Sequence, residues 1–225
     1  MKNFVAICMC VFTLVACGTE EQPKNTREPA LNESLKAAPA KASMTDDQVF
    51  AYILGQEYGL PLYLNQPPRI GEMLDLDAMV QGIVDNEQVQ KDTGFVLQVL
   101  PEEQRALEAR YEQVTKEREA LGDNAKPVVL AGPITGGKVV IADTTAPIIK
   151  YSYTRGVVID GFFAGMSRTF GQKFDEHYFI MGLRESVLAA MDSSFKRSVS
   201  DDTLKAVNAR FVERMEEIRK EQRGQ

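Results

Sequence analysis

The stretch YSYTRGVVIDGFFAGMSRTFGQKF, residues 151–174, decides how this chain is interpreted, because its opening motif has a counterpart elsewhere. It contains Tyr153-x-x-Gly156, and the same motif, Tyr52-x-x-Gly55, lies 101 residues earlier. The same spacing of a tyrosine and a glycine in both places indicates two copies of a single structural unit. The stretch is therefore predicted to open the second copy of a helical unit.

The residues that follow each motif extend this repeat. DLDAMVQGIVDN, residues 75–86, aligns with DEHYFIMGLRES, residues 175–186, and LPEEQRALEARYEQV aligns with VSDDTLKAVNARFVERM further on. The matched pairs in the first alignment are Asp75 with Asp175, Val80 with Ile180, Gly82 with Gly182, Ile83 with Leu183 and Asp85 with Glu185. The spacing stays close to one hundred residues throughout, so one duplication explains all three matches.

Each copy has the pattern of three amphipathic helices, with apolar residues every three or four positions. In the first copy the helices are expected to begin near Thr45, Asp75 and Pro101, and Pro67-Pro68 is expected to break the chain after the first. Acidic pairs lie at predicted helix starts, where negative charge complements the helix dipole. They are Asp46-Asp47, Glu102-Glu103 and Asp201-Asp202. The chain is predicted to be mainly α, with three-helix units at 45–122 and 146–225.

The two units are joined by residues 123–145, which include GPITGGKV, residues 132–139. β-Branched residues flank Gly136-Gly137, so a short β-hairpin or an extended linker is predicted here. The same residues fit the Gly-x-x-x-x-Gly-Lys pattern of a phosphate loop. However, Val139 stands where a Mg²⁺-binding hydroxyl is needed, so nucleotide binding is not predicted.

The N-terminal residues have the pattern of a lipoprotein signal. A lysine precedes an apolar run that is too short to span a membrane, so residues 1–16 are predicted to be a signal peptide. The run ends in LVAC, which resembles a bacterial lipobox and makes Cys17 the expected lipidation site. Residues 17–44 are polar and rich in Pro, Ala and charge, as in a disordered tether. The expected location is the outer membrane of a bacterial cell envelope, facing the periplasm.

Composition argues against several classes of function. Cys8 and Cys10 would leave with the signal peptide and Cys17 would carry lipid, so no thiol chemistry is expected. His177 is the single histidine and cannot form a zinc site alone. The net charge of −6 disfavours nucleic acid as a partner. We therefore expect no cofactor and no bound metal.

The first copy resembles the N-terminal domain of FKBP-type peptidyl-prolyl isomerases such as macrophage infectivity potentiator and FkpA. The resemblance rests on YILGQEYG, LDLDAMVQGIVD and LPEEQRALEARYEQVTKERE, and it is weaker in the second copy, where His177 replaces Asp77. It implies a domain that dimerises by interlocking its first two helices and that is linked to chaperone behaviour. In that family, isomerisation belongs to a separate domain.

A catalytic FKBP domain is an alternative interpretation of residues 151–174. In that family Phe-Asp-Ser follows the first turn and a Trp forms the pocket floor. Here residues 162–165 read FFAG and the chain has no Trp, so no catalytic residues are predicted. The favoured function is a membrane-anchored, non-catalytic chaperone or interaction module that binds unfolded or envelope polypeptides. A divergent prolyl isomerase and a structural envelope lipoprotein remain the alternatives.

Two sets of residues are predicted to carry this function. Helices bearing the paired glycines should cross at a pseudo-twofold axis and form an intramolecular pseudo-dimer, in a chain that remains monomeric. The interface residues are Val80, Gly82, Ile83, Ile180, Gly182 and Leu183. Soft aromatic and methionine side chains suit promiscuous peptide binding, which predicts a client groove. Its candidate residues are Phe162, Phe163, Met166, Phe170 and Phe174.

Overall fold

The computed structural model describes residues 44–126, 128 and 136–223, and these residues are mainly α-helical. Their helices are α1 (Asp46–Ile70), α2 (Leu76–Lys91), α3 (Pro101–Leu121), a short 3₁₀ turn η3 (Gly122–Asn124), α4 (Pro147–Phe170), α5 (Glu176–Met191) and α6 (Asp201–Arg223). The prediction of a mainly α fold is confirmed. The stretch quoted first is helical from its start to Phe170.

Local sequence signals account for the helix starts. Thr45 caps α1 in a reciprocal pair with Gln48, whose backbone N–H it accepts at 3.3 Å. Asp75 and Asp175 cap α2 and α5 by accepting backbone N–H groups of the first turns. α3 begins at Pro101, as predicted, and the three acidic pairs lie in the first turns of α1, α3 and α6.

The predicted break at Pro67-Pro68 is wrong, because α1 continues through both prolines to Ile70. A proline inside a helix removes a backbone hydrogen bond and is normally costly. Here Pro67 and Ile70 are buried, and the Pro67 carbonyl accepts the N–H of Gly71 at 2.8 Å. Gly71 has φ 78° and ends the helix in the left-handed conformation. Packing of the last turn therefore outweighs the local preference.

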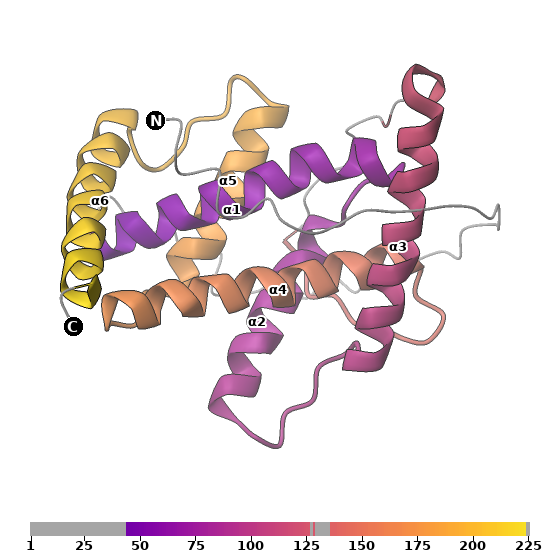
Figure 1. Cartoon of the computed structure of the whole chain (residues 1–225), viewed down its shortest axis with the longest axis horizontal. Coiled ribbons are helices and arrows are strands. Elements are labelled where there is room, and N and C mark those ends of the chain that lie inside the picture. The colour runs from indigo at the N-terminus through magenta and orange to yellow at the C-terminus, as the bar shows by residue number, and fades with distance from the viewer. Residues whose placement is uncertain (1–43, 127, 129–135, 224–225) are drawn as a thin grey trace.

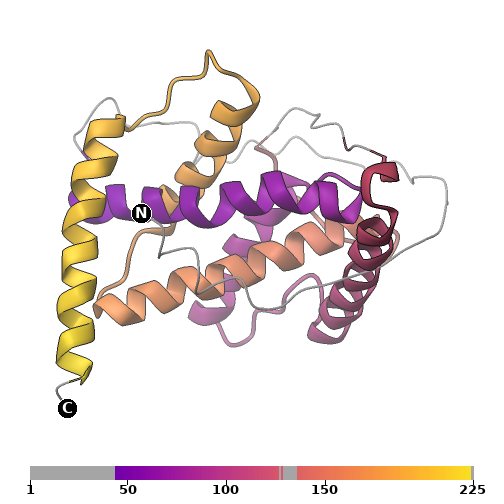
Figure 2. The same cartoon turned by 45° about the horizontal axis from the view of Figure 1, so that its top comes forward.

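The helices of the two halves pack in an exchanged arrangement. The most extensive contacts are those of α1 with α5 and of α2 with α4, so each long first helix lies against the second helix of the other half. α1 and α4 extend across the middle of the molecule, with α6 at one end and α3 at the other (Figures 1 and 2). Neither half buries its own apolar faces alone.

The predicted neighbours of the paired glycines need correction. Gly82 and Gly182 were expected to bring α2 and α5 close together. Instead, Gly82 lies against α4 and Gly182 against α1. α2 and α5 face each other through longer side chains, as in the ion pair of Asp77 with Arg184. The glycines do mark close backbone approaches, but with different partners.

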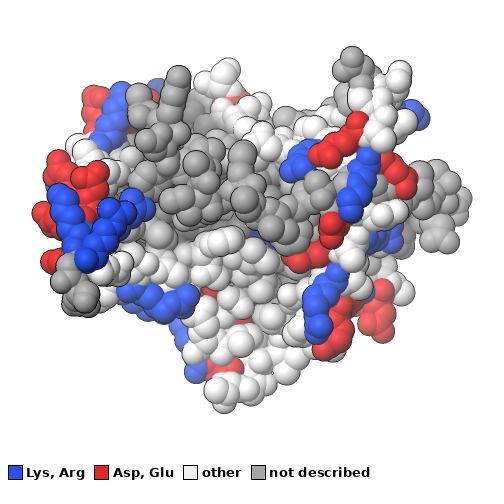
Figure 3. Space-filling model, in the orientation of Figure 1, with Lys and Arg blue, Asp and Glu red and all other residues white. Residues whose placement is uncertain are grey.

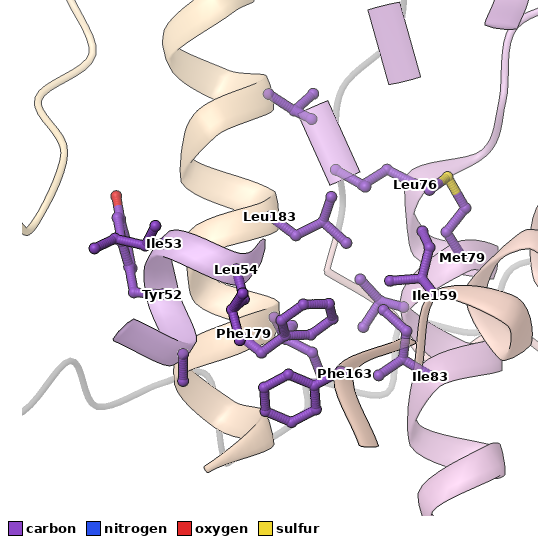
Figure 4. Close-up of a cluster of buried hydrophobic side chains, with 14 of the residues drawn as sticks. Tyr52, Ile53, Leu54, Leu76, Met79, Ile83, Ile159, Phe163, Phe179 and Leu183 are labelled. Carbon is purple, nitrogen blue, oxygen red and sulfur yellow. The ribbon is translucent and has the colours of Figure 1, made fainter. Parts of the chain in front are cut away.

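Both halves contribute to one continuous core. Leu54 of α1, Ile83 of α2, Phe163 of α4 and Leu183 of α5 point into the same cluster (Figure 4). Each fully buried side chain of this size contributes on the order of 2 kcal/mol through the hydrophobic effect. Because the cluster is shared, loss of either half would expose the apolar faces of the other.

Part of the predicted hairpin lies outside the described residues, which include only 136–145 from its second half. This described part contains no strand element. It is held as an extended segment by the side-chain amide of Gln98, which donates to the Val139 carbonyl at 3.2 Å and accepts the Ile141 N–H at 2.8 Å. The Val139 side chain is buried.

Candidate functional site

Four glycines of the repeat form the two tightest helix crossings. At one crossing Gly156 of α4 meets Met79 of α2, and Gly82 meets Tyr153. The other crossing has the equivalent contacts, of Gly55 with Phe179 and of Gly182 with Tyr52. A Cβ atom on any of the four glycines would lie less than 3.0 Å from a backbone atom of the facing helix. Only glycine permits these helices to approach so closely.

A tyrosine and a carboxylate close each crossing. The Tyr52 hydroxyl donates to Glu185 Oε2 at 2.7 Å, and the Tyr153 hydroxyl donates to Asp85 Oδ2 at 2.8 Å. Both tyrosine side chains are fully buried. Burial raises the pKa of each phenol, and the carboxylate acceptor raises it further, so both remain protonated donors.

These contacts give the repeated motifs a physical meaning. The Tyr-x-x-Gly motif of one half is complementary to the Gly-x-x-Asp/Glu motif of the other. The predicted interface residues lie within this contact region, where Val80, Ile83, Ile180 and Leu183 are all buried. Sequence reasoning aligned the tyrosines and the acids but did not pair them across the halves. Their shared spacing was the available signal.

The predicted client groove does not form as one surface. Phe163, Phe170 and Phe174 are buried, so no client could reach them in the folded chain. Met166 is half-buried against the core. Phe162 alone among the five is well exposed, at 49%. The predicted groove is therefore corrected to a single exposed ring.

The buried rings were wrongly predicted to be exposed, because the side chains that cover them come from other helices. Phe170 and Phe174 belong to an aromatic cluster with Phe50 of α1 and Phe211 of α6. The rings of Phe50 and Phe211 are stacked with centroids 3.8 Å apart. This cluster joins the last helix of one half to the first helix of the other. It serves packing rather than recognition.

A carboxyl pair lines an open pocket between α2 and α5. Glu176, the first residue of α5, is 9% exposed, and its Oε1 accepts no hydrogen bond from the described residues. Burial, and then a hydrogen bond with Glu87, raise the pKa of Glu176 to about 9. Burial alone would raise the pKa of Glu87 too, but Glu176, Lys173 and Lys91 lower it to about 2. At neutral pH the pair therefore shares one proton.

The surroundings of this pair are polar on one side and open on the other. Asp160 of α4 is buried beside it and accepts from Asn86 Nδ2 at 2.7 Å and Gln90 Nε2 at 2.9 Å. Burial raises the pKa of Asp160, and Glu87 raises it further. The pocket has a volume of about 540 Å³. Its lining residues are Val84, Glu87, Lys91, Lys173, Phe174, Asp175, Glu176, His177 and Ile180.

The shared proton makes stability depend on pH. The pKa of Glu176 is raised above its ordinary value of 4.5, so its favourable contribution is complete below about pH 4.5 and is lost as pH rises towards 9. Across this window we expect the free energy of unfolding to fall as the pH rises, by at most on the order of 1 kcal/mol per pH unit. Glu176→Gln should flatten the decline in denaturant titrations at several pH values. An equally steep decline in this variant would exclude Glu176 as its source.

The chain matches no family model, no curated protein and no solved structure in the comparisons made. The predicted lipidation site Cys17, the signal peptide and the tether up to residue 43 lie outside the described residues. Within the part of the chain that is described, no helix is both long and apolar enough to span a bilayer. The described residues also contain no group of three or more metal-ligating side chains placed to hold an ion.

Proposed function

We propose that this chain is a non-catalytic chaperone or protein-interaction module of the cell envelope, related to the N-terminal domain of FKBP-type isomerases. The observation that carries the proposal is the pair of hydrogen bonds that join the two halves, from Tyr52 to Glu185 and from Tyr153 to Asp85. In the family that the sequence resembles, two chains interlock through their first two helices. The same exchange within one chain would make an intramolecular pseudo-dimer.

The surface supports polypeptide binding over other roles. Charged side chains gather towards the ends of the molecule, over α3 and α6, while the described surface between them is largely uncharged in this view (Figure 3). The exposed large apolar residues include Val84 on α2 and Phe162 on α4. Two helical arms that flank a weakly charged surface suit an extended, partly apolar chain.

Two assays separate this function from its alternatives. The chain should suppress aggregation of a thermally unfolded model protein, and it should show no activity in a protease-coupled prolyl isomerisation assay. Isomerase activity abolished by an FKBP-directed macrocycle would instead establish the divergent isomerase. Neither activity, in a protein that remains folded, would favour a structural envelope lipoprotein.

The proposed anchoring makes a separate prediction. Cys17→Ala should move the protein from the membrane fraction to the soluble periplasm, because the lipid would be its attachment to the bilayer. Its helical content should be unchanged, since the core described above lies within residues 44–223. Fractionation and circular dichroism test both statements. A wild-type chain found in the soluble fraction would contradict the anchor.

A further inference from the structure

The pocket beside Glu176 has an equivalent in the first half of the chain, and there the chain occupies the site itself. The alignment of α2 with α5 makes Asp77 equivalent to His177, and Val84 equivalent to Arg184. Asp77 and Arg184 form a buried ion pair at 3.0 Å, and Asp77 Oδ1 also accepts the backbone N–H of Gly136 at 3.1 Å. His177 and Val84, in contrast, line the open pocket.

The linker shows how an extended segment fits against these helices. Its backbone supplies the donors: Gly136 N–H reaches Asp77, and Val139 N–H reaches Gln81 Oε1 at 3.4 Å. The Val139 side chain is 5% exposed and is the apolar anchor of the segment. Gln98 holds the following residues from the other side. Backbone hydrogen bonds and one β-branched anchor therefore suffice to seat the segment.

The equivalent groove on the other side holds no such segment among the described residues, and His177 and Met181 replace the acceptors Asp77 and Gln81 there. Val84 is 40% exposed there, while its counterpart Arg184 is 9% exposed under the linker. Ile180 and Phe174 lie beneath the groove at 8% and 1% exposed, so Val84 supplies most of its accessible apolar surface. The Glu176 carboxyl lines the groove, and its Oε1 accepts no hydrogen bond from the described residues. An occupant with a backbone N–H and an apolar side chain would complement these groups.

The charges at the rim narrow the choice of occupant. Lys91 and Lys173 have side chains that are 51% and 68% exposed, while the side chain of Glu87, which pairs with both, is 19% exposed. At the equivalent site, the positions of these two lysines are occupied by Met191 and Met73. Two exposed lysines therefore lie at the rim of the open groove where the other site has methionines. An acidic side chain in the occupant would complement it.

We infer that the groove lined by Val84, Glu176 and His177 binds an extended segment of a partner polypeptide that carries β-branched residues and at least one acidic residue. The segment lies along the groove equivalent to the one that residues 136–141 occupy, but with a backbone N–H directed at the Glu176 carboxyl and an apolar side chain on Val84. This inference rests on the proposed function and names the site and the class of peptide. It also accounts for the different residues at equivalent positions of the two halves.

The test uses the full chain and a labelled peptide derived from the linker. The peptide GGEVVIADT copies residues 136–144 with glutamate in place of Lys138, and fluorescence anisotropy measures its binding. Glu176→Leu copies Leu76, the equivalent residue of the first half, and so keeps the site apolar while it removes the acceptor. We expect the dissociation constant to rise about fivefold, as for the loss of one hydrogen bond. The matched control Glu216→Leu makes the same change on exposed α6 and should bind as the wild type does.

A second peptide with lysine in place of both acidic residues should bind at least about fivefold more weakly, because it would meet Lys91 and Lys173. Equal affinity of the wild type and Glu176→Leu, or no binding at all, would overturn the inference. A further variant replaces residues 35–43 by a Gly-Ser sequence of equal length. If the peptide binds only to this variant, the groove binds the chain's own N-terminal segment and not a partner, and the inference is overturned. If Glu176→Leu suppresses aggregation as well as the wild type does, the groove is not the binding site for partner polypeptides, while the proposed function still holds.

Discussion

Gly156→Ala is expected to destabilise the protein by more than about 3 kcal/mol, whereas Gly161→Ala, in the same helix, is expected to stabilise it. A Cβ at Gly156 would overlap the Met79 carbonyl of α2, and that atom belongs to a helix backbone that cannot move alone. A Cβ at Gly161 meets nothing within 4 Å, so the helix gains up to about 1 kcal/mol from the better helix former.

Denaturant unfolding followed by circular dichroism measures both variants against the wild type. Gly82→Leu and Gly182→Leu should behave like Gly156→Ala. Each should lower the stability of the whole protein, which should still unfold in one transition because both halves share the core. Two separate transitions, or equal tolerance of alanine at Gly156 and Gly161, would contradict the crossing geometry.

The second large effect is expected when the chain is divided. Fragments 1–128 and 129–225 should each lack cooperative unfolding alone and should form a stable one-to-one complex when mixed. The reason is that α1 finds its main partner in α5, and α2 finds it in α4. Each fragment alone therefore leaves most of its apolar surface exposed.

The two different fragments should bind each other more tightly than two copies of the same fragment do. Two copies of the first fragment would place Asp77 opposite Val84, whereas in the intact chain it meets Arg184. An unpaired buried carboxylate costs several kcal/mol, so like pairs are disfavoured. Light scattering and mixed-fragment circular dichroism would show the complex. In the intact chain, the linker should favour internal pairing because it raises the effective concentration of each half for the other. A stable dimer of fragment 1–128 that does not exchange with the second fragment would refute this internal pairing.

Features that depend on neighbours in sequence were predicted well. The capping residues Thr45 and Ser200, Pro101 at the start of α3 and the acidic first turns all act within one helical turn. The error at Pro67 arose where burial of the last turn of α1 outweighed a local rule. The candidate groove failed for a related reason, since exposure of Phe170 depends on whether Phe211 of a distant helix covers it.

By itself, the sequence determined that the chain is helical, where most helices begin and that the unit is repeated, because each depends on spacing along one segment. Tertiary structure alone decided which helices meet. Glycine at 82 and 182 indicates a close approach but carries no side chain that could specify a partner. The observed partners are joined by the buried hydrogen bond of Tyr153 with Asp85 and by its equivalent, of Tyr52 with Glu185. Each bond satisfies a polar group that burial would otherwise leave unpaired. Because both halves carry the same tyrosine and an equivalent carboxylate, the motif is compatible with pairing within one half or across the halves, and only the tertiary structure shows which pairing occurs.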